Sequence, residues 1–293
     1  MLPGSRIDLQ APNPKTNQQM VCDEFSDDAL ESLLATLHDM YGFDFRDYSR
    51  AHIRRRVLHR MSVSGLSDPA ALEKQISTDP AFAYQFLQDL SITVTEMFRD
   101  PGFYRRLREK VIPVLRTYPF IKIWHAGCST GQEAYSMAIL LQEEGVYERT
   151  TIYATDFNQE ALDKAKAGIF PNRLMKEYTS GYQLSGGKES FGSYYTSSYD
   201  MAIMNQNLKK NIVWGHHNLV TDSVFAEVHL VLCRNVLIYF NKELQEKVHG
   251  LFYDSLISGG VLCLGSKESL QFSKFAGQYA EIDHDHRIFK KKY

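Results

Sequence analysis

The sequence has few cysteines, and their positions do not form a metal-binding or redox motif. Four cysteines are spread over 293 residues, and no two of them lie in a Cys-x-x-Cys pair. This spacing excludes a dense disulfide framework and a structural zinc site built on such pairs. We therefore expect reduced, partly buried thiols at Cys22, Cys128, Cys233 and Cys263.

The sequence also lacks a long hydrophobic run and an excess of charge of one sign. It contains no apolar stretch of membrane-spanning length, and residues 1–19 are polar, unlike a secretory signal. The formal net charge is −2, so no global attraction draws the chain to nucleic acid or to an anionic membrane. We expect a soluble, cytoplasmic protein that neither binds nucleic acid nor inserts into a membrane, with a disordered tail at 1–22.

What is present is an ordinary globular composition, with 44% hydrophobic residues, and an N-terminal third that carries helix signals. After a capping serine at Ser26, leucines recur on one helical face as far as Leu37, in the i, i+3, i+4, i+7 pattern. No strand signal precedes residue 120, so we predict a small helical domain at 23–90. Its other helices are expected at 49–61, 70–76 and 81–90.

From residue 121 strands alternate with helices, which predicts a mostly parallel α/β sheet covered on both faces. Two short apolar segments, 279–282 and 287–290, predict a terminal antiparallel hairpin. This Rossmann-like arrangement suits the common methyltransferase architecture better than a plain dinucleotide-binding fold. We expect a linker and first helix at 91–120 and the sheet domain at 121–293, with an irregular insertion or small β-subdomain at 181–211. The expected strands are 121–125, 151–155, 212–215, 228–233 and 260–265, and the expected helices are 132–143, 158–167 and 242–257.

A loop of small residues, Gly127 to Gly131, joins the first expected strand to its helix. Small residues at such a turn let a ligand approach the backbone, and the helix amides that follow can bind its polar groups. The next strand ends in Asp156, whose carboxylate can accept both ribose hydroxyls of a nucleoside. Together the two features predict a nucleoside cofactor. Each also has a plainer interpretation, a tight turn for the loop and a helix cap for Asp156.

The same loop matches the Gly-x-Ser-x-Gly nucleophile elbow of hydrolases, with Ser129 as the nucleophile. Asp156 and either His284 or His286 would then complete a triad, but this hypothesis leaves the other polar motifs unused. A metal site is not expected, because the histidine pair at 216–217 has no third ligand at a suitable spacing.

Further polar residues follow strands of the predicted sheet, where open α/β sheets bind ligands. Arg234 and Asn235 follow an apolar strand, and the hydroxyl of Tyr239 can reach a reacting centre from the same loop. Asn218 ends the preceding strand, where it can contact an adenine. Arg99, at the junction with the helical domain, can form a charge-assisted bond to a carboxylate. Taken singly, these residues also fit core packing or an ordinary linker.

The second expected helix is basic, with Arg54, Arg55, Arg56, His59 and Arg60. Arg56 and Arg60 are four residues apart and share a helical face, so they can meet a carboxylate-rich partner. A solvated surface face is the alternative interpretation.

Taken together, six motifs resemble those of the CheR family, the bacterial chemotaxis receptor methyltransferases that use S-adenosylmethionine to methylate receptor glutamates. The resemblance extends from Asp23 to the C-terminus. It departs from the family pattern at Met97, His125, Gln132 and the segment 266–268. The motifs are Thr95–Asp100, Ala126–Glu133, Ala154–Asp156, His217–Leu219, Cys233–Phe240 and Gly259–Gly265.

The resemblance implies a helical domain followed by an S-adenosylmethionine-binding α/β domain with a small β-subdomain. It also implies that Arg99 and Tyr239 face the transferable methyl group and the substrate, with S-adenosylhomocysteine as a product. The basic helix would meet the methylation helices of chemoreceptors through Arg54, Arg56 and Arg60. The residues placed at the cofactor are Thr93, Thr95, Arg99, Glu133, Asp156, Asn218, Leu219, Arg234 and Asn235, beside Gly127 of the glycine loop.

The resemblance therefore predicts methyl transfer to a glutamate carboxylate, which is already ionised at neutral pH and requires no strong base. A monomer is expected. Because 181–211 is the least family-like stretch, tethering to a receptor C-terminal peptide is not expected. The alternatives are a module that binds adenosylmethionine without methylating a receptor, and a methyltransferase that acts on RNA or a small molecule. The modest charge argues against RNA.

Overall fold

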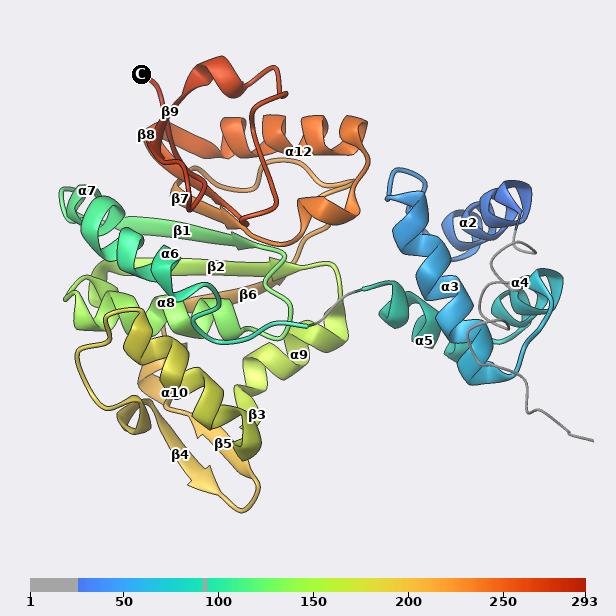
Figure 1. Ribbon diagram of the computed structural model, residues 1–293, viewed down its shortest axis with the longest axis horizontal. Helices are drawn as coiled ribbons and strands as arrows, with labels where there is room; N and C mark the ends of the chain where they lie inside the picture. The colour runs from blue at the N-terminus through green and yellow to red at the C-terminus, as the bar shows by residue number, and fades with distance from the viewer. Residues whose placement is uncertain (1–25, 92–93) are drawn as a thin grey trace, which may run out of the picture. The chain divides into compact units, whose positions relative to one another are not determined.

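The computed structural model describes residues 26–91 and 94–293. The chain divides into two compact units, one that ends at Leu90 and one that runs from Ser91 to Tyr293, and Figure 1 draws both. The tail expected at 1–22 and the predicted cofactor residue Thr93 lie outside the described residues. In the described parts of the chain, no helix combines the length and the apolar character that crossing a bilayer requires.

The described part of the first unit is helical, as predicted. The helix α2 (Asp27–Tyr41) begins where the Ser26 side chain accepts the amide of Ala29, and it ends at Gly42, whose φ is 74°. The leucines of the predicted stripe are buried, and α2 packs against α4 while α3 packs against α5. These helices are α3 (Arg50–Ser64), α4 (Pro69–Thr78) and α5 (Pro80–Leu90).

The second unit is built on a seven-stranded sheet with the order β6-β2-β1-β7-β8-β10-β9. The first five strands of this order are parallel, and β10 and β9 are antiparallel, which confirms the predicted sheet with its terminal hairpin. Ile123 of β1 lies in register between Ile152 of β2 and Leu230 of β7. The strands are β1 (Ile121–Ala126), β2 (Thr150–Asp156), β6 (Ile212–His216), β7 (Val228–Cys233), β8 (Leu256–Leu264), β9 (Tyr279–Asp283) and β10 (Ile288–Lys291).

The helix α8 connects β1 to β2, a loop without a helix connects β6 to β7, and Figure 1 shows α8 and α9 beside β2. The predicted helix at 242–257 ends at Ser255, and β8 begins earlier than predicted, at Leu256. The β-branched Ile257 and the left-handed Gly259, with a φ of 77°, disfavour a longer helix. The elements are α6 (Pro101–Arg106), η1 (Leu107–Val111, a π-helical turn), α7 (Ile112–Leu115), α8 (Gln132–Glu143), η2 (Tyr147–Arg149), α9 (Gln159–Ala167), η5 (Leu237–Tyr239), α12 (Lys242–Ser255) and η6 (Ala276–Gln278).

The segment between α9 and β6 forms a small antiparallel sheet with the order β3-β5-β4. It begins before the predicted 181 and includes a helix, α10 (Met175–Leu184), that the sequence did not indicate. Gly181 weakens the local helix signal, whereas the buried side chains of Tyr178 and Tyr182 anchor the helix in the core. The other elements are β3 (Ile169–Pro171), η3 (Asn172–Leu174), η4 (Phe191–Tyr194), β4 (Tyr195–Ser198), β5 (Met201–Met204) and α11 (Gln206–Lys209).

Candidate functional site

The glycine loop between β1 and α8 has a conformation that its small residues make possible. Gly127 and Gly131 have φ values of 80° and 92°, in the left-handed region that favours glycine. A Cβ atom on Gly127 would lie 2.6 Å from the Cγ2 atom of Val236, and one on Gly131 would lie 2.9 Å from the Cβ atom of Ala165. Both glycines are therefore required by close packing as well as by backbone geometry.

Asp156 lies at the end of β2 and is joined directly to this loop. Its Oδ2 atom accepts the amide of Ser129 at 2.8 Å, and its Oδ1 atom accepts the amide of Asn158 at 2.9 Å. Burial raises the pKa of Asp156, and the backbone hydrogen bonds oppose that rise. The cap of α9 is Asn158, whose side chain accepts the amide of Ala161. A carboxylate has about four acceptor positions, and the amides of Ser129, Asn158 and Phe157 do not use all of them, so Asp156 can still accept a hydrogen bond from a ligand.

The hydrolase hypothesis is not supported by the sheet topology. His286 lies in the β9–β10 turn, where its Nδ1 atom is 2.8 Å from Asp283, and His284 pairs with Glu281. Two strands, β7 and β8, separate β1 from β10, which corresponds to roughly 14 Å at the usual strand spacing. Neither histidine is placed to act as a base for Ser129.

The buried side chain of Arg234 forms the centre of a charge cluster that includes the exposed Asp100. Its Nη2 atom lies 2.7 Å from Asp100, and its Nη1 atom lies 3.1 Å from Glu133. The guanidinium also stacks over the ring of Phe103, at 4.0 Å from the centroid. The same Nη2 atom donates to the backbone carbonyl of Arg99 at 3.4 Å. Arg234 therefore holds the segment that carries Arg99 against the end of β7.

Glu133, in the first turn of α8, is held in its charged form by two partners. His125 Nδ1 lies 2.9 Å from one carboxylate oxygen, and Arg234 binds the other. Burial alone would raise the pKa of Glu133, but the interactions with His125 and Arg234 outweigh it and leave that pKa below its ordinary value. The predicted residues Glu133 and Arg234 thus act as a pair.

The segment before α6 carries two predicted residues and has an unusual backbone. Phe98 and Asp100 have φ values of 54° and 57°, and between them the side chain of Arg99 is partly exposed. Thr95 is also partly exposed. The amide of Phe98 donates to the hydroxyl of Ser136 in α8 at 2.9 Å, which ties this segment to the same helix as Glu133.

Asn218 and Leu219 follow β6, next to the end of β2. The amide of His217 donates to the carbonyl of Asp156 at 3.2 Å, so the two strand ends are joined. The Oδ1 atom of Asn218 accepts the amide of Val220 at 2.9 Å, and this bond closes a local turn. Asn218 is partly exposed and Leu219 is buried. The structure therefore brings the predicted adenine contact to the same edge of the sheet as Asp156.

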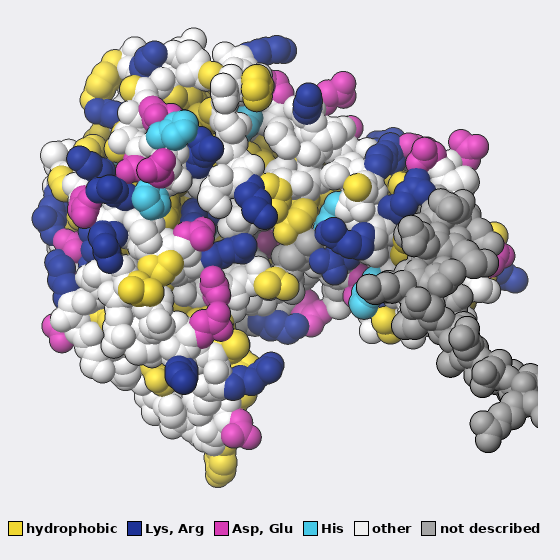
Figure 2. Space-filling model, viewed as in Figure 1, with side chains coloured by type: hydrophobic (Ala, Val, Ile, Leu, Met, Phe, Trp, Pro, Cys, Tyr) yellow, Lys and Arg dark blue, Asp and Glu magenta, His cyan; other side chains and the backbone are white. Residues whose placement is uncertain are grey.

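The three predicted receptor contacts of α3 differ in exposure. Arg60 is only 7% exposed and forms an ion pair with Asp89 inside the helical unit. Arg54 pairs with the exposed Asp27, and Arg56 is partly exposed. Arg60 thus has an internal structural role, whereas Arg54 and Arg56 are closer to the surface. On the face seen in Figure 2, basic and acidic side chains are interspersed.

Sequence reasoning gave no role to three residues that hold the predicted ones in place. Asp100 and His125 bind Arg234 and Glu133, as described, and Glu268 accepts hydrogen bonds from the loop that carries Asn235 and Tyr239. Asp100 lies inside one of the six motifs and His125 replaces a serine typical of the family, whereas Glu268 matches the family and follows two residues that depart from it. Of the three, only Asp100 lies within a motif, and the fold alone identifies the partners of all three.

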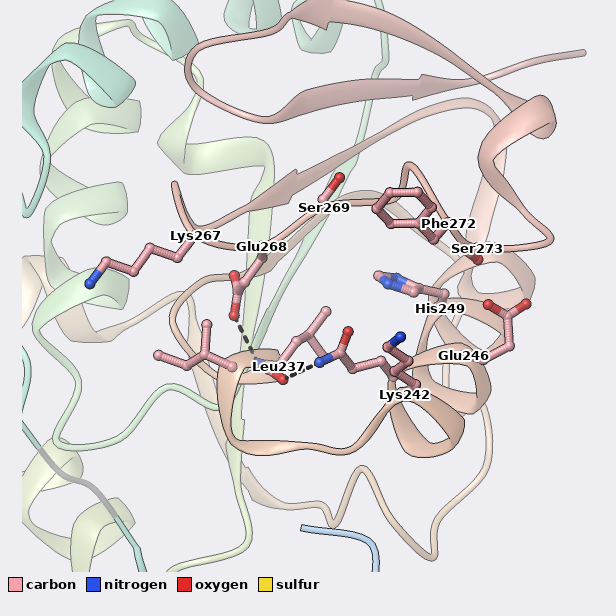
Figure 3. Close-up of a pocket in the computed structure, with 11 residues that line it drawn as sticks. Leu237, Lys242, Glu246, His249, Lys267, Glu268, Ser269, Phe272 and Ser273 are labelled. Carbon is pink, nitrogen blue, oxygen red and sulfur yellow. Dashed lines mark hydrogen bonds between the residues drawn. The ribbon is translucent and has the colours of Figure 1, made fainter. Parts of the chain in front are cut away.

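A pocket of about 460 Å³ lies beside the loop between β7 and α12, and Figure 3 shows the side chains that line it. Leu237 and Ile238 of the loop, Gln245 and His249 of α12, and Glu268 contribute to its walls. Among residues 26–91 and 94–293, no group of three or more His, Cys, Asp or Glu side chains is placed to hold a metal ion.

Comparison with known proteins identifies relatives along nearly the whole described chain. The CheR methyltransferase SAM-binding domain matches residues 93–287, and the CheR methyltransferase all-alpha domain matches residues 28–91. The Pseudomonas putida protein Cher3 is 48% identical over 93% of this chain and 100% of its own length. The chemotaxis protein methyltransferase of Listeria innocua is 29% identical over 78% of this chain and 85% of its own.

Solved structures give a weaker likeness. The N-methyltransferase NodS of Bradyrhizobium japonicum, in complex with S-adenosyl-L-homocysteine, is 12% identical, with a TM-score of 0.38 over 76% of this chain and 98% of its own.

Proposed function

This chain belongs to the CheR methyltransferase family and has its S-adenosylmethionine-binding domain, and we propose that it methylates glutamate side chains of chemoreceptors. The products would be a glutamate methyl ester and S-adenosylhomocysteine. One observation supports the proposal above all: the 2.8 Å hydrogen bond from Ser129 to Asp156, which joins the glycine loop and the acidic strand end into one site. The names of relatives as chemotaxis protein methyltransferases support the choice of acceptor.

The residues at the ends of β1 and β2 fit the cofactor. Gly127 and Gly131 keep Cβ atoms out of the loop, so a ligand can approach the backbone there. Beside its three backbone donors, Asp156 retains acceptor capacity for a ribose hydroxyl. The Oγ atom of Ser129 is buried and has no hydrogen-bond partner within the described residues, so a polar ligand atom can satisfy it. Asn218 and Leu219 lie at the same edge for the adenine.

When bound, S-adenosylmethionine supplies a methyl group activated by its sulfonium. The residues of this chain then need to orient the acceptor and exclude water, because a glutamate with a pKa of about 4.3 is already ionised at neutral pH. Arg99 can align a carboxylate by a charge-assisted bond, and the hydroxyl of Tyr239 can position the acceptor. Such alignment is proximity catalysis and requires no general base.

The acceptor surface would include the basic helix α3. Arg54 and Arg56 are the predicted contacts closest to the surface, and acidic receptor helices are their natural electrostatic partners. Because the methylated segments of chemoreceptors are cytoplasmic, we expect the protein to act there, as a monomer. Arg60 would support α3 from within through Asp89.

A methyl-transfer assay tests the proposal directly. The full chain is incubated with tritiated S-adenosylmethionine and a receptor cytoplasmic domain, and we expect base-labile label on the receptor. The matched acceptor has glutamine in place of the methylated glutamates, and it should take up no label, because an amide cannot form the ester. Binding of S-adenosylhomocysteine without any base-labile label would contradict the proposal and favour a binding module.

A further inference from the structure

The loop Cys233–Phe240 is held by a single buried carboxylate from a distant part of the chain. Glu268 is 4% exposed. Its Oε1 atom accepts the amides of Val236 and Leu237, both at 2.8 Å, and its Oε2 atom accepts the amide of Asn235 at 3.1 Å. The amide of Gly265 also donates to Oε2. Four backbone donors therefore converge on one side chain.

This arrangement is specific to a carboxylate. Three consecutive amides that point to one side form a concave donor site, which an anion fills best. Without the carboxylate, these amides would be buried and unpaired, which is costly enough to change the loop conformation. Asn235 has a φ of 62°, an uncommon value for a residue other than glycine, so the loop depends on such support.

Two neighbouring residues are matched to Glu268. A Cβ atom on Gly265 would lie 2.7 Å from the Oε2 atom of Glu268 and 2.8 Å from the amide nitrogen of Asn235, so only glycine allows this approach. On the other side of the loop, the Nε2 atom of Gln245 donates to the carbonyls of Leu237 and Phe240, both at 3.0 Å. Figure 3 shows the hydrogen bond between Glu268 and Leu237 as a dashed line.

The supported loop contacts the predicted site at several points. Val236, whose amide Glu268 holds, packs against Gly127 so closely that a Cβ atom there would meet its side chain. Arg234 begins the loop with its bonds to Asp100 and Glu133, and Tyr239 lies in the turn that follows Leu237. A shift of this loop would therefore move three side chains together: Val236, which packs against Gly127, Arg234, which binds Glu133, and Tyr239, the proposed acceptor contact.

We propose that Glu268 is a positioning residue for methyl transfer. It fixes the Cys233–Phe240 loop against the glycine loop and so sets the positions of Asn235 and Tyr239. This role rests on the proposed function for its catalytic consequence. Its structural part, the effect on cofactor binding, does not depend on the identity of the methyl acceptor. Glu268 acts through the loop and is not itself assigned contact with cofactor or substrate.

The test compares Glu268→Gln with Glu246→Gln in the full chain. Glutamine keeps the shape of the side chain but loses the charge. Its NH2 group is a hydrogen-bond donor, so it cannot accept the backbone amides of the loop as the second carboxylate oxygen does. Glu246 lines the same pocket but accepts the amide of Lys274, outside the loop. We expect Glu268→Gln to weaken binding of S-adenosylhomocysteine about tenfold, which equals about 1.4 kcal/mol. We expect kcat for methyl transfer to fall about 100-fold, as for a displaced catalytic group.

Hydrogen exchange gives a readout of loop position. The amides of Asn235, Val236 and Leu237 should exchange faster in Glu268→Gln and be unchanged in Glu246→Gln. A folded Glu268→Gln with the cofactor affinity, kcat and exchange rates of the wild type would overturn the proposal. The proposal would also be overturned if Glu268→Gln lowered the melting temperature but left cofactor affinity, kcat and amide exchange unchanged.

A second variant covers the case in which Glu268→Gln does not fold. Gly265→Ala keeps the carboxylate but pushes it away from the amide of Asn235, and we expect the same direction of change in cofactor affinity and amide exchange. Normal affinity and exchange in Gly265→Ala would contradict the proposal. If the wild type methylates no receptor but Glu268→Gln still weakens cofactor binding, the acceptor assignment fails and the positioning role stands.

Discussion

At the scale of single residues, carboxylates buried among backbone amides recur in this molecule. Asp156 accepts the amides of Ser129 and Asn158, and Glu268 accepts four amides. Each carboxylate joins two segments that meet only in the folded chain. The consequences differ, because Asp156 faces the proposed nucleoside and Glu268 supports the loop beside it.

Cofactor affinity should depend on pH through Asp156. Only the ionised carboxylate accepts hydrogen bonds at both oxygens. Because burial raises the pKa of Asp156, protonation begins at a higher pH than for an ordinary aspartate of about 3.9. We therefore expect the affinity for S-adenosylhomocysteine, measured by calorimetry, to fall as the pH is lowered from neutral toward that raised pKa.

Asp156→Asn separates this effect from acid unfolding. The change removes hydrogen bonds to a charged group, worth about 1.5–3 kcal/mol, so binding at neutral pH should weaken by a factor of about 10 to 100. The remaining affinity should vary little with pH. An Asp156→Asn variant that keeps the wild-type pH profile would show that another group is responsible.

At the scale of elements, the β1–α8 loop leaves no room for a side chain at Gly131. Gly131 caps α8 with a left-handed φ of 92°, and the side chains of Ala165 and Trp214 occupy the space around it. The backbone conformation and the surrounding packing thus exclude a side chain for separate reasons. The two contributions can be measured separately, because Gly145 has a left-handed backbone conformation without close packing around it.

Gly131→Ala should destabilise the unit from Ser91 to Tyr293 more than Gly145→Ala. Gly145 has a φ of 67° and nothing within 4 Å of an added Cβ atom, so alanine there costs only the left-handed strain of about 1–2 kcal/mol. At Gly131, overpacking adds about 1–3 kcal/mol. The free energy of unfolding in urea measures both changes. Equal losses at the two positions would mean that the contacts with Ala165 and Trp214 relax freely.

At the scale of the whole molecule, the proposed function divides between two units. The proposed cofactor residues that the structure describes lie in the unit from Ser91 to Tyr293, and the basic helix lies in the unit that ends at Leu90. Each unit has its own buried core. Changes in α3 should therefore affect the encounter with an acidic receptor and leave cofactor binding intact.

Arg56→Gln tests this division of labour. We expect a rise in KM for the receptor of roughly two- to fivefold, the effect of one partly exposed charge, and a weaker dependence of KM on salt. Binding of S-adenosylhomocysteine should be unchanged. Lys74→Gln, which removes a positive charge from the exposed surface of α4, is the matched control. An equal effect of both changes would indicate a general charge effect instead of a contact through α3.

The sequence predicted much of the fold because its signals are local. The leucine stripe of α2 and the alternating strands from Ile121 onward follow from side-chain periodicity within short segments. The helix α10 was missed because Gly181 lowers the local helix signal, and the packing of Tyr178 and Tyr182 against the core overrides it. The late start expected for β8 has the same origin, since a boundary depends on packing as well as on propensity.

By itself, the sequence determined the helical N-terminal part, the alternation of strands and helices that follows, the glycine loop and the acidic end of the next strand. Each depends on the chemistry of neighbouring residues. Only the tertiary structure decided the strand order, the burial of Arg60 and the partners of the charged groups. Arg234 and Asp100 are 134 positions apart, and Glu268 binds an amide 33 positions earlier. A buried charge is stable only beside the partners that folding brings to it, and short-range patterns carry no record of such distant pairs.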